Sequence, residues 1–192
     1  APALLGCVLR RRVGELWLAA MIVETEAYLR SERASHSSLG RTPSREPMFM
    51  PAGTLYLYHS RGGPSLNLSA RGAGDAVLIK AGVAWSDGRS DAKSLAAMHR
   101  LNPRRDGGDR PQHRLCSGQG LLCRALDLRV ADWSGRAFDA TEFFAEGGPR
   151  PESIVQCRRL GIPEGRDEEL PYRFVHGDHT ASATQNPLRK RG

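Results

Sequence analysis

The sequence predicts an α/β (α+β) fold, a single compact domain with a curved, mainly antiparallel sheet and peripheral helices. Three observations predict it. The chain has 192 residues, the size of one ordinary domain, and no linker or internal repeat divides it, so we assign residues 1–192 to one domain. Short β-type runs separated by turn residues fill the first half, and helical patterns appear only later. Hydrophobic residues make up 40% of the chain, which is enough for a buried core.

The first half of the chain predicts a series of antiparallel strands. Residues 8–13 and 16–28 are two β-type runs around a turn at Gly14-Glu15, which indicates a hairpin. The second run begins with consecutive apolar residues (16–23), so we expect its start to be buried on both faces. The polar segment that follows is irregular. Further strands are expected over residues 54–58, 66–70 and 76–81, with a turn over residues 59–65.

The second half of the chain predicts two helices and a last strand. Apolar residues recur at helical spacing over residues 91–101 and again over residues 117–128, where Ser117 is a candidate N-cap. The segment between them, residues 102–114, is an arginine-rich loop. The remaining expectations are an exposed Gly/Pro-rich segment over residues 145–151, a short helix over 154–160, a strand over 172–176 and a frayed basic tail over 186–192.

The chain is strongly basic. It has 28 Lys and Arg against 21 Asp and Glu, which gives a net charge of +7 and an isoelectric point near 9.7. Such a charge is typical of proteins that bind polyanions, and the alternative is a basic protein with no such partner. No run approaches the ~18 apolar residues of a membrane span, and no basic-then-apolar leader begins the sequence, so we expect no membrane association.

The cysteines indicate neither a metal site nor a disulfide framework. Cys7, Cys116, Cys123 and Cys157 include no C-x-x-C pair, and the spacing of the middle two matches no common zinc motif. We expect reduced thiols in an intracellular protein, with no metal and no other cofactor.

One face of the strand over residues 16–28 carries two carboxylates and a phenol. Side chains alternate along a strand, so Glu24, Glu26 and Tyr28 share a face. Two carboxylates this close repel each other, and at least one needs a cation or a hydrogen-bond donor. A carboxylate beside an aromatic ring can activate water to hydrolyse a glycosidic bond. The alternative is an edge strand with two solvated glutamates.

Two further patterns suit a nucleic-acid ligand. Tyr56 and Tyr58 share one face of their strand; such tyrosines are commonly core residues, but on a basic protein they can also stack bases, at about 1–3 kcal/mol per base. Ser117 and Gly118 begin the second helix directly after the arginine-rich loop, where backbone N–H groups could contact a phosphate. Any capped helix has a similar start, so this second pattern is weak alone.

Taken in chain order, these segments resemble the alkyladenine (3-methyladenine) DNA glycosylase family. The most specific are Glu24-Thr25-Glu26-Ala27-Tyr28 and Met48-Phe49-Met50 followed by Gly53-Thr54-Leu55-Tyr56-Leu57-Tyr58. The other matching stretches are Leu4-Leu5-Gly6, His36-Ser37, Arg41-Thr42-Pro43, Asn67-Leu68-Ser69 and residues 115–128. The resemblance implies an intracellular monomer that needs no cofactor. It also implies monofunctional excision of damaged purines from double-stranded DNA.

The resemblance also implies roles for the matching residues. Glu26 would be the catalytic base that positions and deprotonates the attacking water, with Glu24 in a supporting or structural role. Tyr28 would stack on one face of a base flipped out of the duplex. His36 and Tyr58 would line the other face, and His36 would also hydrogen-bond the base edge.

Further roles follow from the resemblance, and two positions depart from the family. Asn67 would exclude normal guanine by crowding its exocyclic amine, and Lys80 stands near the scissile nucleotide where the family usually has an arginine. The family hairpin usually ends in Tyr-Gly-Met, whose tyrosine fills the gap left by the flipped nucleotide. Here the tip reads Arg61-Gly62-Gly63-Pro64. We expect Arg61 to enter the gap and Gly62 to contact DNA beside it.

Two other functions remain open at this point. One is a catalytically weak homologue that binds DNA without excising a base, and the other is a hydrolase of free nucleosides that uses Glu24 and Glu26 as paired acids. A protein that only binds DNA has no use for Glu26, and a small neutral substrate gains little from a basic surface.

Overall fold

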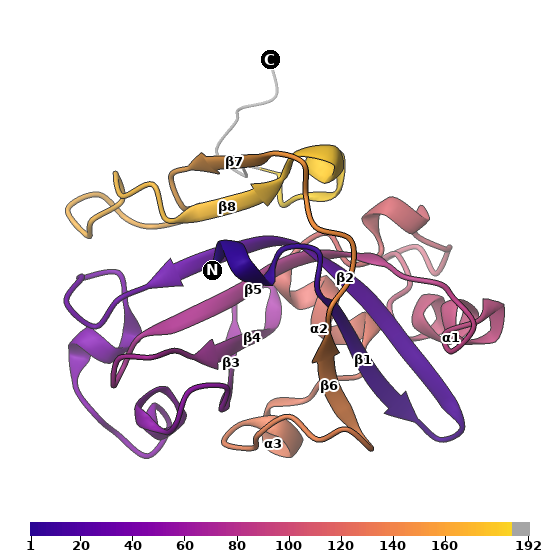
Figure 1. Ribbon diagram of the computed structural model, residues 1–192, viewed down its shortest axis with the longest axis horizontal. Helices are drawn as coiled ribbons and strands as arrows, with labels where there is room; N and C mark the ends of the chain where they lie inside the picture. Colours follow the sequence, from indigo (N-terminus) through magenta and orange to yellow (C-terminus); the bar gives the residue numbers. More distant parts are fainter. Residues whose placement is uncertain (186–192) are drawn as a thin grey trace.

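The computed structural model describes residues 1–185, and Figure 1 shows its curled antiparallel sheet, which confirms the predicted α+β architecture. Neighbouring strands follow the order β3-β4-β5-β2-β1-β6, and β8 pairs with both β2 and β7. The strands are β1 (Val8–Val13), β2 (Leu16–Tyr28), β3 (Leu55–Ser60), β4 (Gly63–Ser69), β5 (Ala76–Ala84), β6 (Phe143–Glu146), β7 (Ile154–Cys157) and β8 (Arg173–His176). The predicted hairpin of β1 and β2 is present with the expected bounds.

The long strand β2 organises the sheet. Its first half pairs with β1, and residues 24–26 pair with β8 instead, while β5 runs along the other edge. The register with β5 shifts on both sides of Glu24, which marks a β-bulge. Because β2 is paired on both edges, its apolar start is buried as predicted, and so are its acidic residues. The alternative of an edge strand with two solvated glutamates is therefore wrong.

The helices cover the sheet and its margins. They are α1 (Ala92–Leu101), α2 (Gln119–Ala125) and α3 (Val130–Trp133). The side chain of Asp91 caps α1 by accepting from the backbone N–H groups of Lys93 and Ser94, which explains why the predicted helix begins there. Helix α2 packs on β4 and β5. It places Leu122 and Cys123 in the main core with Leu66 and Ile79 of those strands.

Three sequence predictions are corrected. Residues 154–157 form strand β7, not a helix, because β8 offers them a full antiparallel partner. Strand β6 occupies part of the segment expected to be exposed over residues 145–151, since the free edge of β1 pairs with it. The turn between β3 and β4 is shorter than residues 59–65: β3 continues to Ser60 and β4 starts at Gly63.

Ser117 is not the N-cap of the second helix. Gly118 holds that position with a φ of 129°, a conformation that favours glycine, and no side chain caps the helix. The predicted basic tail, residues 186–192, lies outside the described residues. Within residues 1–185, no helix is both long and apolar enough to cross a bilayer.

Candidate active site

Strand β2 carries a fully buried carboxylate to the centre of the candidate site. Glu26 has 0% exposure, yet three donors hold it. Its Oε2 accepts from the Tyr28 hydroxyl at 2.8 Å and lies 3.4 Å from the Lys80 Nζ. Its Oε1 accepts from the backbone N–H of Leu160 at 3.2 Å. These three donors replace the water that the carboxylate loses on burial.

The neighbouring carboxylate has separate partners. Glu24 is also fully buried; its Oε1 accepts from the Arg173 Nε at 2.6 Å and its Oε2 from the backbone N–H of Thr184 at 2.6 Å. The two acids on the same strand therefore do not share a ligand or a proton. Glu24 joins β2 to β8 and to the segment after it, whereas Glu26 faces the candidate site.

Aromatic rings from two elements stand opposite Glu26. The rings of Tyr56 and Tyr58 on β3 stack at a centroid distance of 5.5 Å. The His36 ring lies edge-on to Tyr58 at 4.6 Å, and its Nδ1 lies 3.0 Å from the Tyr56 hydroxyl oxygen. The segment after β2 supplies His36 in a short 3-10 helix over His36–Leu39. These contacts fix the orientation of the His36 ring.

The rings enclose a cavity of about 360 Å³. Pockets for small ligands typically span about 300–1,000 Å³ and combine apolar walls with a few polar groups, as this one does. Its lining includes Tyr28, His36, Tyr56, Tyr58, Asn67, Lys80 and Gln119. A second wall comes from the chain before β8 and contains Leu160, Gly161, Ile162, Pro163 and Arg166. Glu26 lies directly behind the lining, in contact with Tyr28 and Lys80.

Burial sets the protonation states of the lining. Burial, with the nearby Glu26 carboxylate, raises the pKa of Tyr28, so its phenol remains a donor. Burial likewise raises the pKa of Tyr56 to about 12. For His36, burial first and then Arg45 and Arg166 lower the pKa, so its imidazole is neutral at pH 7. The cavity therefore presents neutral aromatic faces beside the Glu26 carboxylate.

Asn67 and the hairpin tip are both held by backbone contacts. The Asn67 Nδ2 donates to the Tyr56 carbonyl at 3.1 Å, which fixes the amide at the cavity wall. The exposed turn of Arg61 and Gly62 joins β3 to β4. Helix α2 supports this turn from behind: a Cβ on Gly120 would lie 2.1 Å from the Gly62 carbonyl oxygen, so only glycine allows this approach.

The structure brings most of the predicted site residues together, but not all of them. Glu26, Tyr28, His36, Tyr58 and Asn67 meet at one cavity, and so does Lys80. Ser117 and Gly118 do not offer free donors. The buried Ser117 hydroxyl donates to the Ala183 carbonyl at 3.1 Å, and the Gly118 N–H donates to the Cys116 carbonyl at 3.0 Å. The expectation that they bind phosphate is therefore corrected.

Sequence reasoning missed the second wall of the cavity. The predicted short helix over 154–160 covers only the first residues of this wall, and no prediction covers residues 161–166, which no periodic pattern marks. The contacts of this wall with Glu26 and Ala27 span more than 130 positions of the chain. The only local signal was Arg158-Arg159, a basic pair after an apolar strand. Tyr56, which also lines the cavity, was predicted only to share a strand face with Tyr58.

No cluster of three or more His, Cys, Asp or Glu side chains within residues 1–185 could hold a metal ion. Burial raises the pKa of both the Cys116 and the Cys123 thiol. These two side chains belong to the core beside α2, away from the cavity lining.

Known proteins resemble this chain over nearly its whole length. A family model described as methylpurine-DNA glycosylase matches residues 1–180. A relative from Pseudomonas savastanoi pv. phaseolicola is 53% identical over 99% of this chain and 86% of its own length. One from Pseudomonas aeruginosa is 51% identical over 99% of this chain and 80% of its own length. An archaeal relative from Methanoculleus marisnigri is 36% identical over 91% of this chain and 86% of its own length. The names of all three assign them, provisionally, as 3-methyladenine DNA glycosylases.

Proposed function

This chain belongs to the methylpurine-DNA glycosylase family, and from that premise we propose that it flips alkylated purines out of duplex DNA and hydrolyses their N-glycosidic bonds. The observation that carries the proposal is the buried Glu26 carboxylate directly behind an aromatic cavity. A base inside the duplex is out of reach of any buried acid, so enzymes of this class extrude the target nucleotide into a pocket.

The cavity suits an extruded, positively charged purine. Alkylation of a ring nitrogen gives the base a positive charge, which an aromatic face attracts by about 0.5–2 kcal/mol per good contact. All three aromatic residues line the cavity, and in the proposed complex Tyr28 stacks on one face of the base while His36 and Tyr58 contact the other. Because His36 is neutral, it adds no repulsion to a cationic base and its ring can hydrogen-bond the base edge.

Glu26 supplies the base for the hydrolytic step. A carboxylate can accept about four hydrogen bonds, and three described partners, Tyr28, Lys80 and Leu160, occupy Glu26. One acceptor position remains for a water molecule. Glu26 takes a proton from that water as the bond between the sugar and the base breaks, and its charge stabilises the oxocarbenium-like sugar. The alkylated base leaves as a neutral molecule.

The proposed reaction is monofunctional. A glycosylase that also cuts the strand needs a neutral amine to form a Schiff base with the sugar. The amine nearest to Glu26 is Lys80, and it is ion-paired with the carboxylate. The ammonium therefore stabilises the site electrostatically, near the scissile nucleotide, and is not used as a nucleophile. We further propose that the protein acts as a monomer, wherever the cell keeps its DNA.

The decisive experiment uses a duplex with a single 7-methylguanine. We expect the wild-type protein to release the methylated base faster than spontaneous depurination and to leave the strand intact until alkali is added. Glu26→Gln keeps the size of the side chain and removes the base, so release should fall by about 100-fold or more. Glu24→Gln is the matched control, since it changes an equally buried acid that does not contact the cavity lining.

The other outcomes identify the competing functions. Tight binding of the duplex without base release by the wild type would contradict the proposal and identify a protein that only binds DNA. Turnover of free 7-methylguanosine at a rate similar to that of the duplex would instead identify a nucleoside hydrolase. Equal loss of release in Glu26→Gln and Glu24→Gln would exclude Glu26 as the specific base.

A further inference from the structure

A buried guanidinium lies directly behind the ring of Tyr28. The side chain of Arg159 has 0% exposure, and its Cζ lies 4.6 Å from the centroid of the Tyr28 ring. Its terminal nitrogens donate to both oxygens of Glu32, at 2.8 and 2.7 Å. The same group also donates to the carbonyls of Ala27 and Asp167, at 2.8 and 3.2 Å.

We propose that Arg159, neutralised by Glu32, is a positioning residue that holds Tyr28 and Glu26 in the geometry needed for base excision. This inference rests on the proposed function. Arg159 does not line the cavity and does not contact the substrate, so it acts only through other residues.

The contacts of Arg159 reach both functional side chains. Its hydrogen bond to the Ala27 carbonyl holds the backbone of β2 between Glu26 and Tyr28. Its guanidinium lies over a face of the Tyr28 ring and is not part of the cavity lining, so it supports the ring when a base stacks on Tyr28 from the cavity. The next residue, Leu160, donates its backbone N–H to the Glu26 Oε1 at 3.2 Å. Arg159 therefore positions two groups. One is the Tyr28 ring, and the other is the Leu160 N–H, which is one of the three donors to the Glu26 carboxylate.

The ion pair also fixes the second wall of the cavity. Glu32 lies in the turn after β2, and its Oε1 also accepts from the backbone N–H of Leu29 at 2.6 Å. Arg159 thus ties the turn that leads to His36 to the segment that leads to Arg166, and both of these residues line the cavity. A buried ion pair contributes little net stability compared with an apolar pair of the same shape. The directional hydrogen bonds of this pair, however, fix the relative positions of the two segments, which apolar contacts do not do.

The charge of Arg159 is balanced locally. Since Glu32 contacts the guanidinium through both oxygens, the pair is close to neutral as seen from the cavity. Its effect is therefore on position, and a shift of about 1 Å in a reacting group can reduce the rate about 100-fold.

The experiment compares Arg159→Met and Arg159→Lys with wild type in single-turnover excision of 7-methylguanine from a duplex. We expect Arg159→Met to lower the rate at saturating enzyme by about tenfold or more, while the half-saturating enzyme concentration changes less than about threefold. Arg159→Lys keeps the charge but loses the two-pronged contact with Glu32, so it should restore only part of the rate. The concentration of active protein in each sample is determined first by titration, so that unfolded molecules do not lower the calculated rate.

Arg10→Met is the matched control. Arg10 is similarly buried, with 4% side-chain exposure, and pairs with Glu146 at 2.7 Å and with Asp87, and none of these residues lines the cavity. We expect it to lower the melting temperature without lowering the rate per active molecule. Glu32→Gln is a second variant, which weakens the same ion pair while keeping the shape of the side chain. It should also slow excision, and it tests the inference in case Arg159→Met does not fold.

Two results would overturn the inference. One is a wild-type rate in folded Arg159→Met or Glu32→Gln. The other is an equal loss of rate in Arg10→Met, which would show that breaking any buried ion pair slows the reaction. If the wild-type protein releases no base, the proposed function fails first, and that outcome is distinct from both.

Discussion

At the scale of single residues, the candidate site depends on which polar groups are buried and what each contacts. Glu24 and Glu26 lie two positions apart on one strand and are equally buried, but their partners differ completely. Tyr28 has two contacts of different kinds: its hydroxyl donates to Glu26, and its ring lies between Arg159 and the cavity. The chemical role of each group follows from its neighbours more than from its type.

The pH dependence of stability should report on His36. Its pKa is lowered in the folded protein by burial and by Arg45 and Arg166, while in the unfolded chain it stays near the ordinary value of about 6.5. The unfolded state therefore binds more protons below that pH, and the folded state loses stability as the pH falls from about 7 to about 5. We expect the unfolding free energy of wild type to drop more than that of His36→Gln across this range. Parallel curves for the two proteins, measured by urea denaturation, would contradict this.

The amide of Asn67 is expected to set discrimination against normal guanine. It is fixed by its bond to the Tyr56 carbonyl, so it cannot move away from an exocyclic amine that enters the cavity. Asn67→Ala should raise the release of unmodified guanine and leave the release of 7-methylpurines within about threefold of wild type. Chromatography of the bases released from an undamaged duplex measures this. No release of guanine above the wild-type level would remove Asn67 from this role.

At the scale of elements, the hairpin of β3 and β4 and the helix α2 form one unit. The Gln119 Nε2 donates to the Ser60 Oγ at 2.9 Å, and the Arg124 guanidinium lies 3.4 Å from the Gly62 carbonyl oxygen. These contacts hold the hairpin backbone while Arg61 itself stays exposed at the tip. The backbone of the β3–β4 hairpin is therefore held in place where it contacts α2, and the Arg61 side chain at its tip is free to contact DNA.

We propose that Arg61 enters the gap left by the flipped nucleotide, where it gains phosphate attraction and lacks the stacking of a tyrosine. Arg61→Ala should slow base flipping and excision by about tenfold, and Arg61→Tyr should restore or exceed the wild-type rate because an aromatic ring stacks on the neighbouring bases. Stopped-flow fluorescence of a 2-aminopurine placed beside the lesion measures flipping. If neither variant changes the flipping or the excision rate, Arg61 does not fill the gap.

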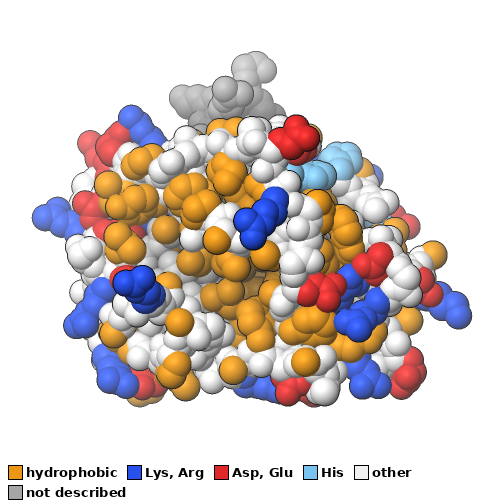
Figure 2. All heavy atoms as spheres, viewed as in Figure 1, with side chains coloured by type: hydrophobic (Ala, Val, Ile, Leu, Met, Phe, Trp, Pro, Cys, Tyr) orange, Lys and Arg blue, Asp and Glu red, His pale blue; other side chains and the backbone are white. Residues whose placement is uncertain are grey.

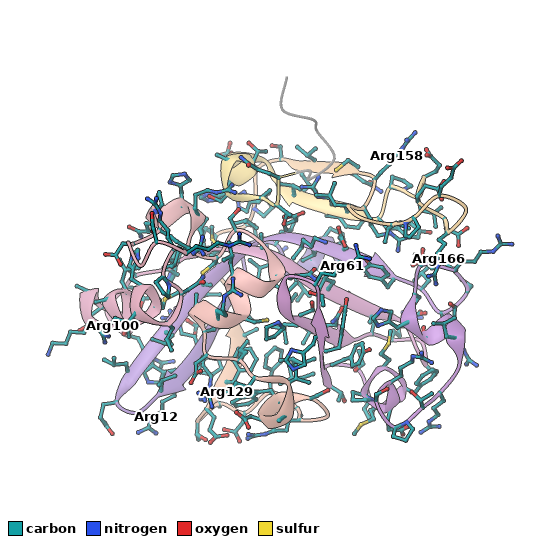
Figure 3. All side chains as sticks on the ribbon, turned by 180° about the vertical axis from the view of Figure 1, so that it is seen from behind. Arg12, Arg61, Arg100, Arg129, Arg158 and Arg166 are labelled. Carbon is teal, nitrogen blue, oxygen red and sulfur yellow. The ribbon has the colours of Figure 1, made fainter. Side chains whose placement is uncertain are left out.

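At the scale of the whole molecule, charge and shape indicate which face meets DNA. The face shown in Figure 2 has hydrophobic side chains over its centre, with Lys and Arg mostly at its margins. Arg61 lies near the middle of the opposite face, and Arg166, which lines the cavity, lies nearer its edge (Figure 3). We therefore expect the duplex to lie across the face seen in Figure 3.

Binding to an undamaged duplex should depend steeply on salt. The net charge of +7 is partly concentrated in exposed arginines, and each phosphate contact releases counterions. We expect the dissociation constant, measured by fluorescence anisotropy, to rise by about tenfold or more between about 50 and 200 mM salt. A change below about twofold would indicate that the basic surface does not follow the phosphate backbone. Cleavage of free nucleosides would show no such dependence.

Much of the site was predictable because its key residues lie in short, specific segments. Glu26 and Tyr28 share a strand face by simple alternation, and Tyr56 and Tyr58 do the same on β3. The β1–β2 hairpin and α1 were equally clear, since a turn and a capped apolar repeat define them locally. That these segments meet at one cavity was implied by the family resemblance and not by any local pattern.

The sequence by itself thus determined the antiparallel sheet, the main helices and the segments that carry the chemistry. Only the tertiary structure decided that residues 154–157 pair as a strand with β8, that the donors of Ser117 and Gly118 are used inside the chain, and that Arg159 stands behind Tyr28. The physical reason is the range of the interactions. Periodicity and turns express contacts between near neighbours in the chain, whereas strand partners and the burial of charge depend on segments farther along the chain, up to 127 positions apart for Arg159 and Glu32.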